Sequence, residues 1–281
     1  MGGSLVGRPI EPYSESLEAK LHRKGNEIFV TGNLTPGEFY IRGDVSSQFV
    51  SGLLFALPLL DGDSFLHVKG KLQSRPYVEL TRDIMAQFQI TTEICGDGFF
   101  IKGNQNYKNT DLYVEGDWTY ASNFFVANRL GGNVKLNGLN YNSLQGDRQV
   151  LDALDKYEVD ISDMPDVFPA LAVNACARVG ITRITGGRRL RFKECDRLSA
   201  MANELSKLGA DVEEEDDSLL VRGTGRLKGG KVDSHNDHRV AMALSIAAAI
   251  CDEPVRLIGS ESVQKSAPRF FEVLKTLGGT D

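Results

Sequence analysis

The sequence lacks the short motifs that mark several large enzyme classes. It has no Walker loop, no GxGxxG opening a helix after a strand and no GxSxG, which excludes the usual nucleotide-binding and serine-hydrolase sites. Its four cysteines are scattered without a CxxC pair, and none of its four histidines lies close to a cysteine in the sequence. This pattern predicts reduced thiols in a cytoplasmic protein and no bound zinc or other metal.

The chain also has no excess of positive charge and no very long apolar run. The net charge of -6 argues against nucleic acid or an anionic membrane as a general partner, but it leaves room for a local basic site. The longest apolar runs are too short to cross a bilayer, and the opening MGGSLVGRP shows no signal-peptide pattern. A length of 281 residues with 41% hydrophobic content is typical of a soluble protein of two domains.

What the chain does have is an internal repeat. One kind of segment begins with polar residues, continues as an apolar helix and ends in a short strand. It recurs four times, at residues 46–70, 121–139, 165–187 and 237–260. Because these helices are apolar nearly all round, we expect them to be buried.

A second kind of segment alternates with the first and is amphipathic. Its copies lie at residues 10–25, 77–90, 147–160, 197–210 and 268–279. Pairs of strands are expected after two of these helices, at residues 91–103 and 210–223. The sequence therefore predicts an α/β (α+β) fold of repeated βαβαββ units, each with one buried helix and one surface helix.

The repeat also predicts a domain boundary. One strand ends and a new unit begins near TDLYVEGDW, residues 110–118, so we expect domains at residues 1–113 and 114–281. No Pro/Gly/Ser-rich linker marks the boundary, which favours two closely joined domains. The first amphipathic segment has no buried helix before it, so the repeat starts in the middle of a unit.

Polar residues stand in the first turn expected for each buried helix. Helix N-termini expose unpaired N–H groups and the positive end of the helix dipole, so they bind anions readily. Ser, Asn and Asp in these positions also act as caps, and capping is the interpretation we favour for residues 120–123. The polar first turns contain Ser46, Ser47 and Gln48, then Tyr120 to Asn123, then Asp166, and finally Asn236 to Arg239.

Basic residues cluster at two of these helix starts. A run of cations leads into the helix at 197–210, and Arg239 lies at the start of another. Cations oppose the helix dipole unless an anion lies between them, and Arg suits carboxylate and phosphate groups. Two interpretations of the basic run therefore stay open: a site for a doubly anionic ligand, or a simple basic turn in contact with solvent. The run consists of Arg188, Arg189, Arg191, Lys193 and Arg197, and isolated cations before a Pro and an amphipathic helix are Arg8 and Lys265.

Two carboxylates accompany these cations, namely Asp166 and Glu194. An acid and a base in a cationic site suit proton transfer to and from a bound substrate. Asp237 and His238 are further titratable candidates. The remaining histidines are expected to be surface or packing residues.

Five stretches resemble the EPSP synthase (3-phosphoshikimate 1-carboxyvinyltransferase) family of enolpyruvyl transferases. They are GDVSSQFVSGLLFALPL, SRPYVELT, FKECDRLSAMANEL, HNDHRVAMALSIAA and QKSAPRFFEVLKTLGG. The resemblance covers nearly the whole chain and implies a two-domain inverse α/β barrel of βαβαββ units, with the first domain truncated. It also implies transfer of the enolpyruvyl group of phosphoenolpyruvate to the 5-hydroxyl of shikimate 3-phosphate through a tetrahedral intermediate. This is a step of the shikimate pathway of aromatic amino-acid biosynthesis, and the family needs no metal or organic cofactor.

The resemblance implies a role for each matching position. Asp166 is the expected base and Glu194 the expected acid that protonates the methylene carbon. The expected ligands of shikimate 3-phosphate are Ser46, Ser47, Gln48, Ser74, Asp166 and Lys193. The expected ligands of phosphoenolpyruvate are Arg8, Gln48, Arg197, Arg239 and Lys265. A further group of candidates is Tyr77, Arg189, Asp237 and His238, where Arg189 replaces the Asn of many relatives.

The family has more than a hundred residues before the SLxxRP match, including ligands for both substrates. We therefore expect little transferase activity from this polypeptide alone, and we name a complementing N-terminal segment and self-association as candidate partners. Two alternatives stay open. One is UDP-N-acetylglucosamine enolpyruvyl transferase, which shares the fold and the phosphoenolpyruvate chemistry. The other is a non-catalytic fragment that keeps partial ligand binding.

Overall fold

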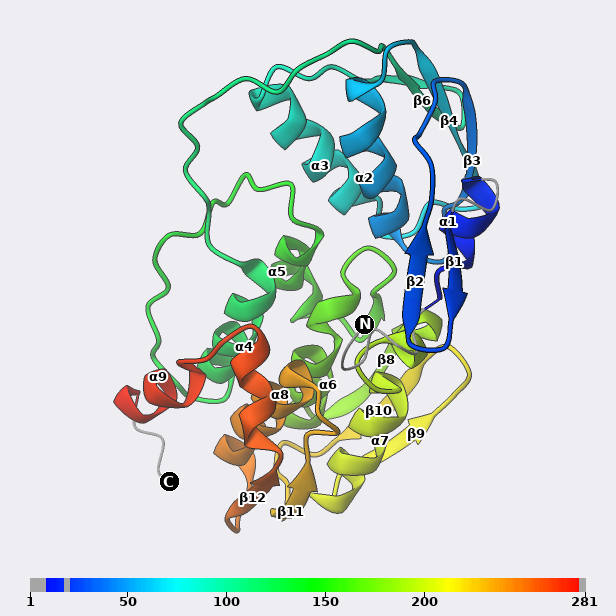
Figure 1. The fold of residues 1–281 in the computed structure, drawn as a ribbon. Coiled ribbons are helices and arrows are strands. Elements are labelled where there is room, and N and C mark those ends of the chain that lie inside the picture. The colour runs from blue at the N-terminus through cyan, green and yellow to red at the C-terminus, as the bar shows by residue number, and fades with distance from the viewer. Residues whose placement is uncertain (1–8, 18–20, 278–281) are drawn as a thin grey trace. The chain divides into compact units, whose positions relative to one another are not determined.

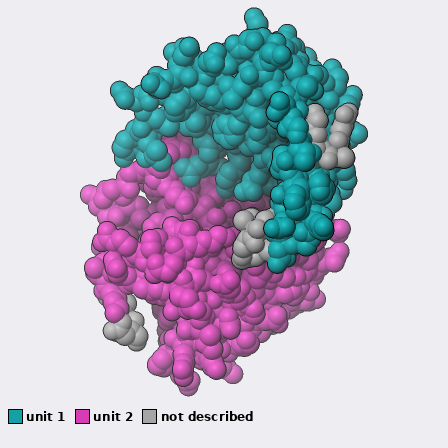
Figure 2. Space-filling view, viewed as in Figure 1, with its two compact units in different colours: residues 1–114, 144–146 teal, residues 115–143, 147–281 magenta. Residues whose placement is uncertain are grey.

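The computed structural model describes residues 9–17 and 21–277 of the chain. They form two compact units (Figure 2), the first made of residues 1–114 and 144–146 and the second of residues 115–143 and 147–281. Each unit has its own buried apolar cluster. The elements of each unit are described separately below.

The first unit contains one complete βαβαββ repeat. Its four-stranded sheet has the order β3-β4-β6-β5, in which β3 and β4 are parallel and the other neighbours are antiparallel. Helices α2 and α3 pack on each other, and the apolar side of α2 is buried through Val50, Leu53 and Leu54. The elements run β3 (Glu38–Arg42), α2 (Ser47–Ala56), β4 (Ser64–Lys69), α3 (Arg75–Gln87), β5 (Glu93–Cys95) and β6 (Gly98–Ile101).

The second unit repeats this order and pairing. Its sheet β7-β8-β10-β9 has one parallel pair, β7 with β8, followed by two antiparallel pairs. The two sheets thus share one topology, which confirms the repeated βαβαββ unit expected from the sequence. The elements run β7 (Glu158–Asp160), α6 (Phe168–Ala177), β8 (Gly180–Thr185), α7 (Arg197–Lys207), β9 (Asp211–Glu214) and β10 (Leu219–Gly223).

A further part of the second unit has a parallel pair, β11 with β12, and helices that precede and follow β12 along the chain. These elements are β11 (Gly230–Asp233), α8 (His238–Ala247), β12 (Val255–Ile258) and α9 (Phe270–Thr276). The remaining helices and strands of the described chain are α1 (Glu11–Ser16), β1 (Leu21–Lys24), β2 (Glu27–Val30), α4 (Trp118–Arg129) and α5 (Val150–Ala153). Short 3₁₀ turns lie at Leu57–Leu59, Gly146–Gln149, Pro165–Val167, Arg188–Phe192, Ala248–Ile250 and Ser260–Lys265.

The core of the second unit is built on its apolar helices, as the sequence predicts. Helices α4, α6 and α8 contact one another and lie side by side (Figure 1). Nine of the ten residues of α6 are buried, and so are eight of the ten of α8. Burying apolar surface is the main force that stabilises such an arrangement. Because these helices are packed in the core, they hold the side chains at their N-terminal ends in fixed positions.

Three expectations about elements are wrong. The amphipathic segment at 10–25 is not one helix, because α1 ends at Ser16 and residues 21–24 pair with β2 as an antiparallel hairpin. The strand expected after α4 is absent from residues 133–139. There the side-chain oxygen of Asn128 accepts from Val134 N at 2.6 Å, and its side-chain nitrogen donates to Val134 O at 2.8 Å. A side-chain amide thus binds the backbone groups that a neighbouring strand would bind.

The helix expected at 147–160 is also shorter than the pattern suggests. Regular α-helix covers only Val150–Ala153. The carbonyl of Leu154 accepts from the side chains of Asn174 and Arg178, at 3.0 and 3.2 Å. Because these side chains occupy a carbonyl that a longer helix would use, tertiary contacts override the local amphipathic pattern.

Candidate active site

The candidate site lies where three helices of the second unit begin. Asp166 lies in the 3₁₀ turn that leads into α6, Arg197 is the first residue of α7, and Asp237 is the N-cap of α8. The three helices contact one another, so residues distant in the sequence meet at their starts. Each helix has ten or eleven residues, and its N-terminal end favours negative charge.

Arg197 is the centre of this cluster. Its side chain is fully buried and donates hydrogen bonds to three carboxylates. Its Nε reaches Asp237 Oδ2 at 2.9 Å and its Nη1 reaches Asp166 Oδ1 at 2.8 Å. Its Nη2 reaches Glu194 Oε2 at 2.7 Å. A single guanidinium group therefore joins the starts of α6, α7 and α8.

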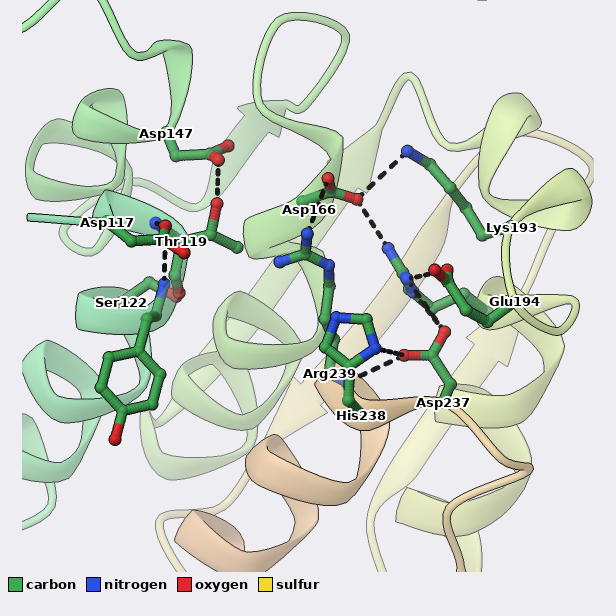
Figure 3. Close-up of polar contacts among 12 residues, drawn as sticks. Asp117, Thr119, Ser122, Asp147, Asp166, Lys193, Glu194, Asp237, His238 and Arg239 are labelled. Atoms are coloured by element: carbon green, nitrogen blue, oxygen red, sulfur yellow. Dashed lines mark hydrogen bonds and ion pairs between the residues drawn. The ribbon is translucent and has the colours of Figure 1, made fainter. Parts of the chain in front are cut away.

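Asp166 is a second meeting point. Besides Arg197, its oxygens form ion pairs with Lys193 Nζ and Arg239 Nη2, both at 3.1 Å. Figure 3 shows Lys193 and Arg239 directed toward Asp166 from different elements. Both cations are about one-quarter exposed, at 24% and 22% of the side-chain surface, so a ligand from solvent can reach them.

Lys265 completes the cluster from the 3₁₀ turn before α9. Its ammonium group forms an ion pair with Glu194, the carboxylate that also accepts from Arg197. The structure thus brings together four cations and three carboxylates, which leaves one excess positive charge. The cations are Lys193, Arg197, Arg239 and Lys265, and the carboxylates are Asp166, Glu194 and Asp237.

The cations keep two carboxylates ionised. Burial alone would raise the pKa of Asp166, but Arg239, Lys193 and Arg197 outweigh it and hold that pKa well below its usual value. Burial acts in the same direction on Glu194, but Arg197 and Lys265 lower its pKa to about 2. In this arrangement both groups are anions at neutral pH, and each can gain basicity if a ligand draws its cations away.

Two other groups have lowered pKa values. Burial lowers the pKa of Lys193, opposed by the charge of Asp166. Burial and then Arg239 lower the pKa of His238 to about 4, so this imidazole is neutral at pH 7. Its Nδ1 has no hydrogen-bond partner among the described residues and lies 3.9 Å from Asp237 Oδ1.

The turn before α8 places Asp237 for two tasks. Its Oδ1 caps the helix by accepting from Arg239 N at 2.8 Å, while its Oδ2 faces Arg197. His235 and Asn236 precede it with φ of 52° and 57°, a left-handed geometry that Asn tolerates better than most residues. Asn236, the other cap suggested by the sequence, lies outside the helix.

Two expectations about the helix starts need correction. Residues 120–123 lie within α4, whose cap is Asp117, accepting from Thr119 N at 2.8 Å (Figure 3). Asp166 does not act as a cap, because no side chain caps that turn. Lys193 and Glu194 reach the cluster from an irregular segment, because α7 begins only at Arg197.

The candidates in the first unit lie at the starts of α2 and α3. Ser46 caps α2 by accepting from Gln48 N at 3.3 Å, and Ser47 is buried in its first turn. Ser74 is buried before α3 with φ 50°, and Tyr77 N donates to its carbonyl at 3.0 Å. The two loops are joined because Gln73 N donates to Gly43 O at 3.0 Å.

Two candidates remain. Arg8 lies outside the described residues. Arg189 donates through Nη2 to the carbonyl of Ser162 at 2.8 Å, which directs it to the loop before α6. The sequence did not show that Asp237 is a partner of Arg197. Its position before the HR pair suggested only a cap or a titratable group.

No group of three or more His, Cys, Asp or Glu within the described parts of the chain is arranged to hold a metal ion. Across residues 9–17 and 21–277, no helix combines the length and the apolar character needed to span a bilayer. The expectation that the protein uses no metal or organic cofactor stays a prediction.

Comparison with solved structures identifies the architecture. The chain superimposes on a structure of EPSP synthase from Acinetobacter baumannii with a TM-score of 0.80 at 23% identity, covering 99% of this chain and 72% of that one. A second EPSP synthase structure from the same species matches with a TM-score of 0.69. The chain is thus an α/β protein with the repeated-unit fold of these transferases.

Sequence comparison identifies the family within that class. The family model for EPSP synthase (3-phosphoshikimate 1-carboxyvinyltransferase) matches residues 2–158 and 152–274. A relative from Clostridium acetobutylicum with that enzyme name is 44% identical over 303 residues, which cover 99% of this chain and 71% of the relative. One from Clostridium novyi is 42% identical, with 99% and 70% covered. The chain belongs to the EPSP synthase family.

Proposed function

We propose that this chain carries the site of a 3-phosphoshikimate 1-carboxyvinyltransferase, which transfers the enolpyruvyl group of phosphoenolpyruvate to the 5-hydroxyl of shikimate 3-phosphate. Family membership and the name shared by the clostridial relatives support this reaction. The observation that carries the proposal is the cluster of four cations and three carboxylates at the starts of α6, α7 and α8. Both substrates are polyanions, and such a cluster suits them.

Phosphoenolpyruvate would meet the accessible cations first. Arg239 and Lys265 each have exposed surface, whereas the guanidinium group of Arg197 is buried against three carboxylates. Arg239 and Lys265 are therefore the direct ligands supported best. Phosphoenolpyruvate can contact Arg197 only if one of the three carboxylates around Arg197 moves away. Glu194 is the best candidate to move, because it also pairs with half-exposed Lys265.

This exchange gives the two carboxylates their chemical roles. When a substrate anion takes over Lys265 and Arg197, Glu194 loses the charges that hold its pKa near 2, so it can accept a proton and deliver it to the methylene carbon. Asp166 is the proposed base, and it accepts the proton of the attacking hydroxyl group once its own cations are drawn toward the substrate. The 5-hydroxyl oxygen then bonds to the central carbon of phosphoenolpyruvate while the methylene carbon takes the proton of Glu194, which breaks the carbon–carbon π bond and gives the tetrahedral intermediate. Cleavage of the C–O bond to phosphate, with loss of a proton from the new methyl group, restores the double bond in the product.

The proposed ligands of shikimate 3-phosphate fall into two groups. Lys193 and Asp166 belong to the second unit, while Ser46, Ser47, Gln48 and Ser74 belong to the first. The capped start of α2 and the adjoining loop before α3 supply hydroxyl and amide groups of the kind that bind phosphate. Tyr77, Arg189, Asp237 and His238 stay candidates that support these ligands.

The test is Arg239→Ala, with calorimetric titration of phosphoenolpyruvate in the presence of shikimate 3-phosphate. We expect a loss of about 2–5 kcal/mol in binding free energy if the pair is desolvated in the complex, with little change in melting temperature. Asp166 keeps Lys193 and Arg197 in the variant. The control is Arg269→Ala, which removes an exposed pair with Glu272. An unchanged affinity with a large loss of stability would refute the binding role.

Phosphate release with both substrates separates the remaining alternatives. Turnover with shikimate 3-phosphate supports the proposed reaction, and turnover with UDP-N-acetylglucosamine instead supports the related transferase. Binding without turnover supports a non-catalytic fragment. The same assay, together with native mass measurement, tests the expected low activity of the chain alone and its association with a complementing segment or a second copy.

A further inference from the structure

The segment that carries Lys193 and Glu194 has little regular structure of its own. It follows the 3₁₀ turn Arg188–Phe192 and precedes α7, and no helix or strand includes residues 193–196. Lys193 N donates to Leu190 O at 3.3 Å, a long bond. Other contacts must therefore hold the two site residues against Asp166 and Arg197.

Arg191 supplies a set of such contacts. Its guanidinium group binds the hairpin of β9 and β10 through Nε to Asp216 O at 3.1 Å, Nη2 to Glu215 O at 2.8 Å and Nη1 to Glu214 Oε1 at 2.7 Å. Two of these acceptors are backbone carbonyls, so the position of Arg191 depends on the hairpin backbone and not only on side chains. A planar fork with five donors is suited to this task, and a Lys is not.

The same guanidinium group also reaches the far end of the segment. Arg191 Nη1 binds Asp196 Oδ2 at 2.9 Å and Ser199 Oγ at 3.3 Å. Asp196 in turn caps α7, because its Oδ1 accepts from Ser199 N at 3.1 Å. The pair Arg191–Asp196 thus closes a short loop that contains Lys193 and Glu194, anchored on one side to the hairpin and on the other to the helix that starts with Arg197.

We propose that Arg191 is a positioning residue for the transferase site, because it holds the loop of residues 192–195 so that Lys193 meets Asp166 and Glu194 meets Arg197 and Lys265. This inference rests on the proposed function. Arg191 makes no contact with the cluster itself in the described structure, and it acts through the backbone between residues 191 and 196. Small displacements of such groups are costly because charged contacts and proton transfer depend on exact distances.

Arg183 provides a matched control. It projects from β8 onto the same hairpin and binds Glu215 through two guanidinium nitrogens and Ser218 Oγ at 3.3 Å. Removing either arginine takes a multiply bonded cation from one hairpin, but only Arg191 is tied to the segment before α7. A purely structural role predicts similar effects of Arg183→Ala and Arg191→Ala.

The first experiment compares phosphoenolpyruvate binding of the two alanine variants and their residual steady-state kinetics, each relative to the unmodified chain. We expect Arg191→Ala to lower kcat/KM by about a hundred-fold, the cost of a misplacement of roughly 1 Å, and Arg183→Ala to have little effect. Melting temperatures should fall by similar amounts. Arg191→Lys, which keeps the charge but loses the fork, should recover only part of the loss and also serves if the alanine variant folds poorly. Equal kinetic losses in the two alanine variants would overturn the proposal.

The second experiment does not depend on enzyme activity. Cys195 lies inside the loop, with its Sγ 3.8 Å from Asp237 Oδ2, and burial and then Asp237 raise its pKa to about 12. Alkylation by iodoacetamide, followed for each cysteine peptide by mass spectrometry, should be several-fold faster at Cys195 in Arg191→Ala than in Arg183→Ala. Cys251 serves as the internal reference.

The two experiments separate the possible failures. If the unmodified chain neither binds nor converts phosphoenolpyruvate, the proposed function fails, while the alkylation rates still test Arg191. If the alkylation rate of Cys195 is the same in both alanine variants, the loop does not depend on Arg191 and the inference is wrong.

Discussion

At the scale of single residues, the most demanding feature is the buried charge of Arg197. A guanidinium group without exposed surface is stable only when carboxylates replace water around it, and three of them do so here. The desolvation cost explains why the groups lie so close together. The same contacts hold Asp166 and Glu194 in their ionised forms, so stability and the proposed chemistry use one network.

This arrangement predicts a large effect of Arg197→Met. Removing the cation leaves three carboxylates close together with less positive charge to balance them, and we expect a loss of about 3–5 kcal/mol in unfolding free energy. Denaturant titration monitored by circular dichroism measures it. Arg188→Met is the comparison, since Arg188 has an exposed pair with Asp216 and should cost less than about 1 kcal/mol. A loss for Arg197→Met no larger than for Arg188→Met would show that the network does not stabilise the fold.

At the scale of elements, the electrostatics of the candidate site depend on the N-terminal ends of α6, α7 and α8. Arg239 in the first turn of α8 and Arg197 in that of α7 are unfavourable for their helices unless anions lie beside them. Asp166, Glu194 and Asp237 fill that role without ligand. His238, the first residue of α8, is left neutral because burial and Arg239 disfavour its charged form.

The neutral His238 predicts a pH dependence of stability. Its pKa is lowered from 6.5 to about 4 in the folded chain, so between these values the unfolded chain binds the proton more tightly. The contribution of His238 to the free energy of unfolding is fully present above pH 6.5 and is lost as the pH falls toward 4. We expect the melting temperature of His238→Gln to fall less than that of the unmodified chain over this interval. Parallel curves for the two proteins would contradict the assignment. Glu194, with a pKa lowered from 4.5 to about 2, adds a further loss only below pH 4.5.

At the scale of the whole molecule, two units carry the candidate residues. The second contains the charged cluster, and the first contains Ser46, Ser47, Gln48 and Ser74. The limits we propose for the domains, residues 1–113 and 114–281, fall in a segment without helix or strand. Tyr113 and Val114 there are 82% and 81% exposed.

Limited digestion with chymotrypsin tests these domain limits. We expect the first cut after Tyr113, since exposed loops are the preferred sites of proteolysis, with release of fragments 1–113 and 114–281. Tyr141 is the internal comparison, because it also lies in a loop but packs on Trp118 with ring centroids 5.4 Å apart. Mass spectrometry identifies the cuts. Initial cleavage after Tyr141 would place the boundary elsewhere.

The local pattern was sufficient for much of the fold. Apolar helices alternating with amphipathic ones predicted the βαβαββ unit, since period and burial are properties of short stretches. The pattern failed where a side chain bound a backbone group that regular structure would otherwise use. Asn128 binds the backbone of Val134, and Asn174 and Arg178 bind the carbonyl of Leu154, just after α5. The periodicity of apolar residues does not show which side chains will bind the backbone in this way.

For the site, the sequence by itself determined the residue types: cations, carboxylates and capping groups at the starts of apolar helices, which suit anionic ligands. Only the tertiary structure decided which of them meet. Asp166, Arg197 and Asp237 are separated by more than thirty positions at each step, and Arg197 contacts both carboxylates because α6, α7 and α8 pack together. Charge pairing acts over a few ångströms, so its partners are determined by packing and not by order along the chain.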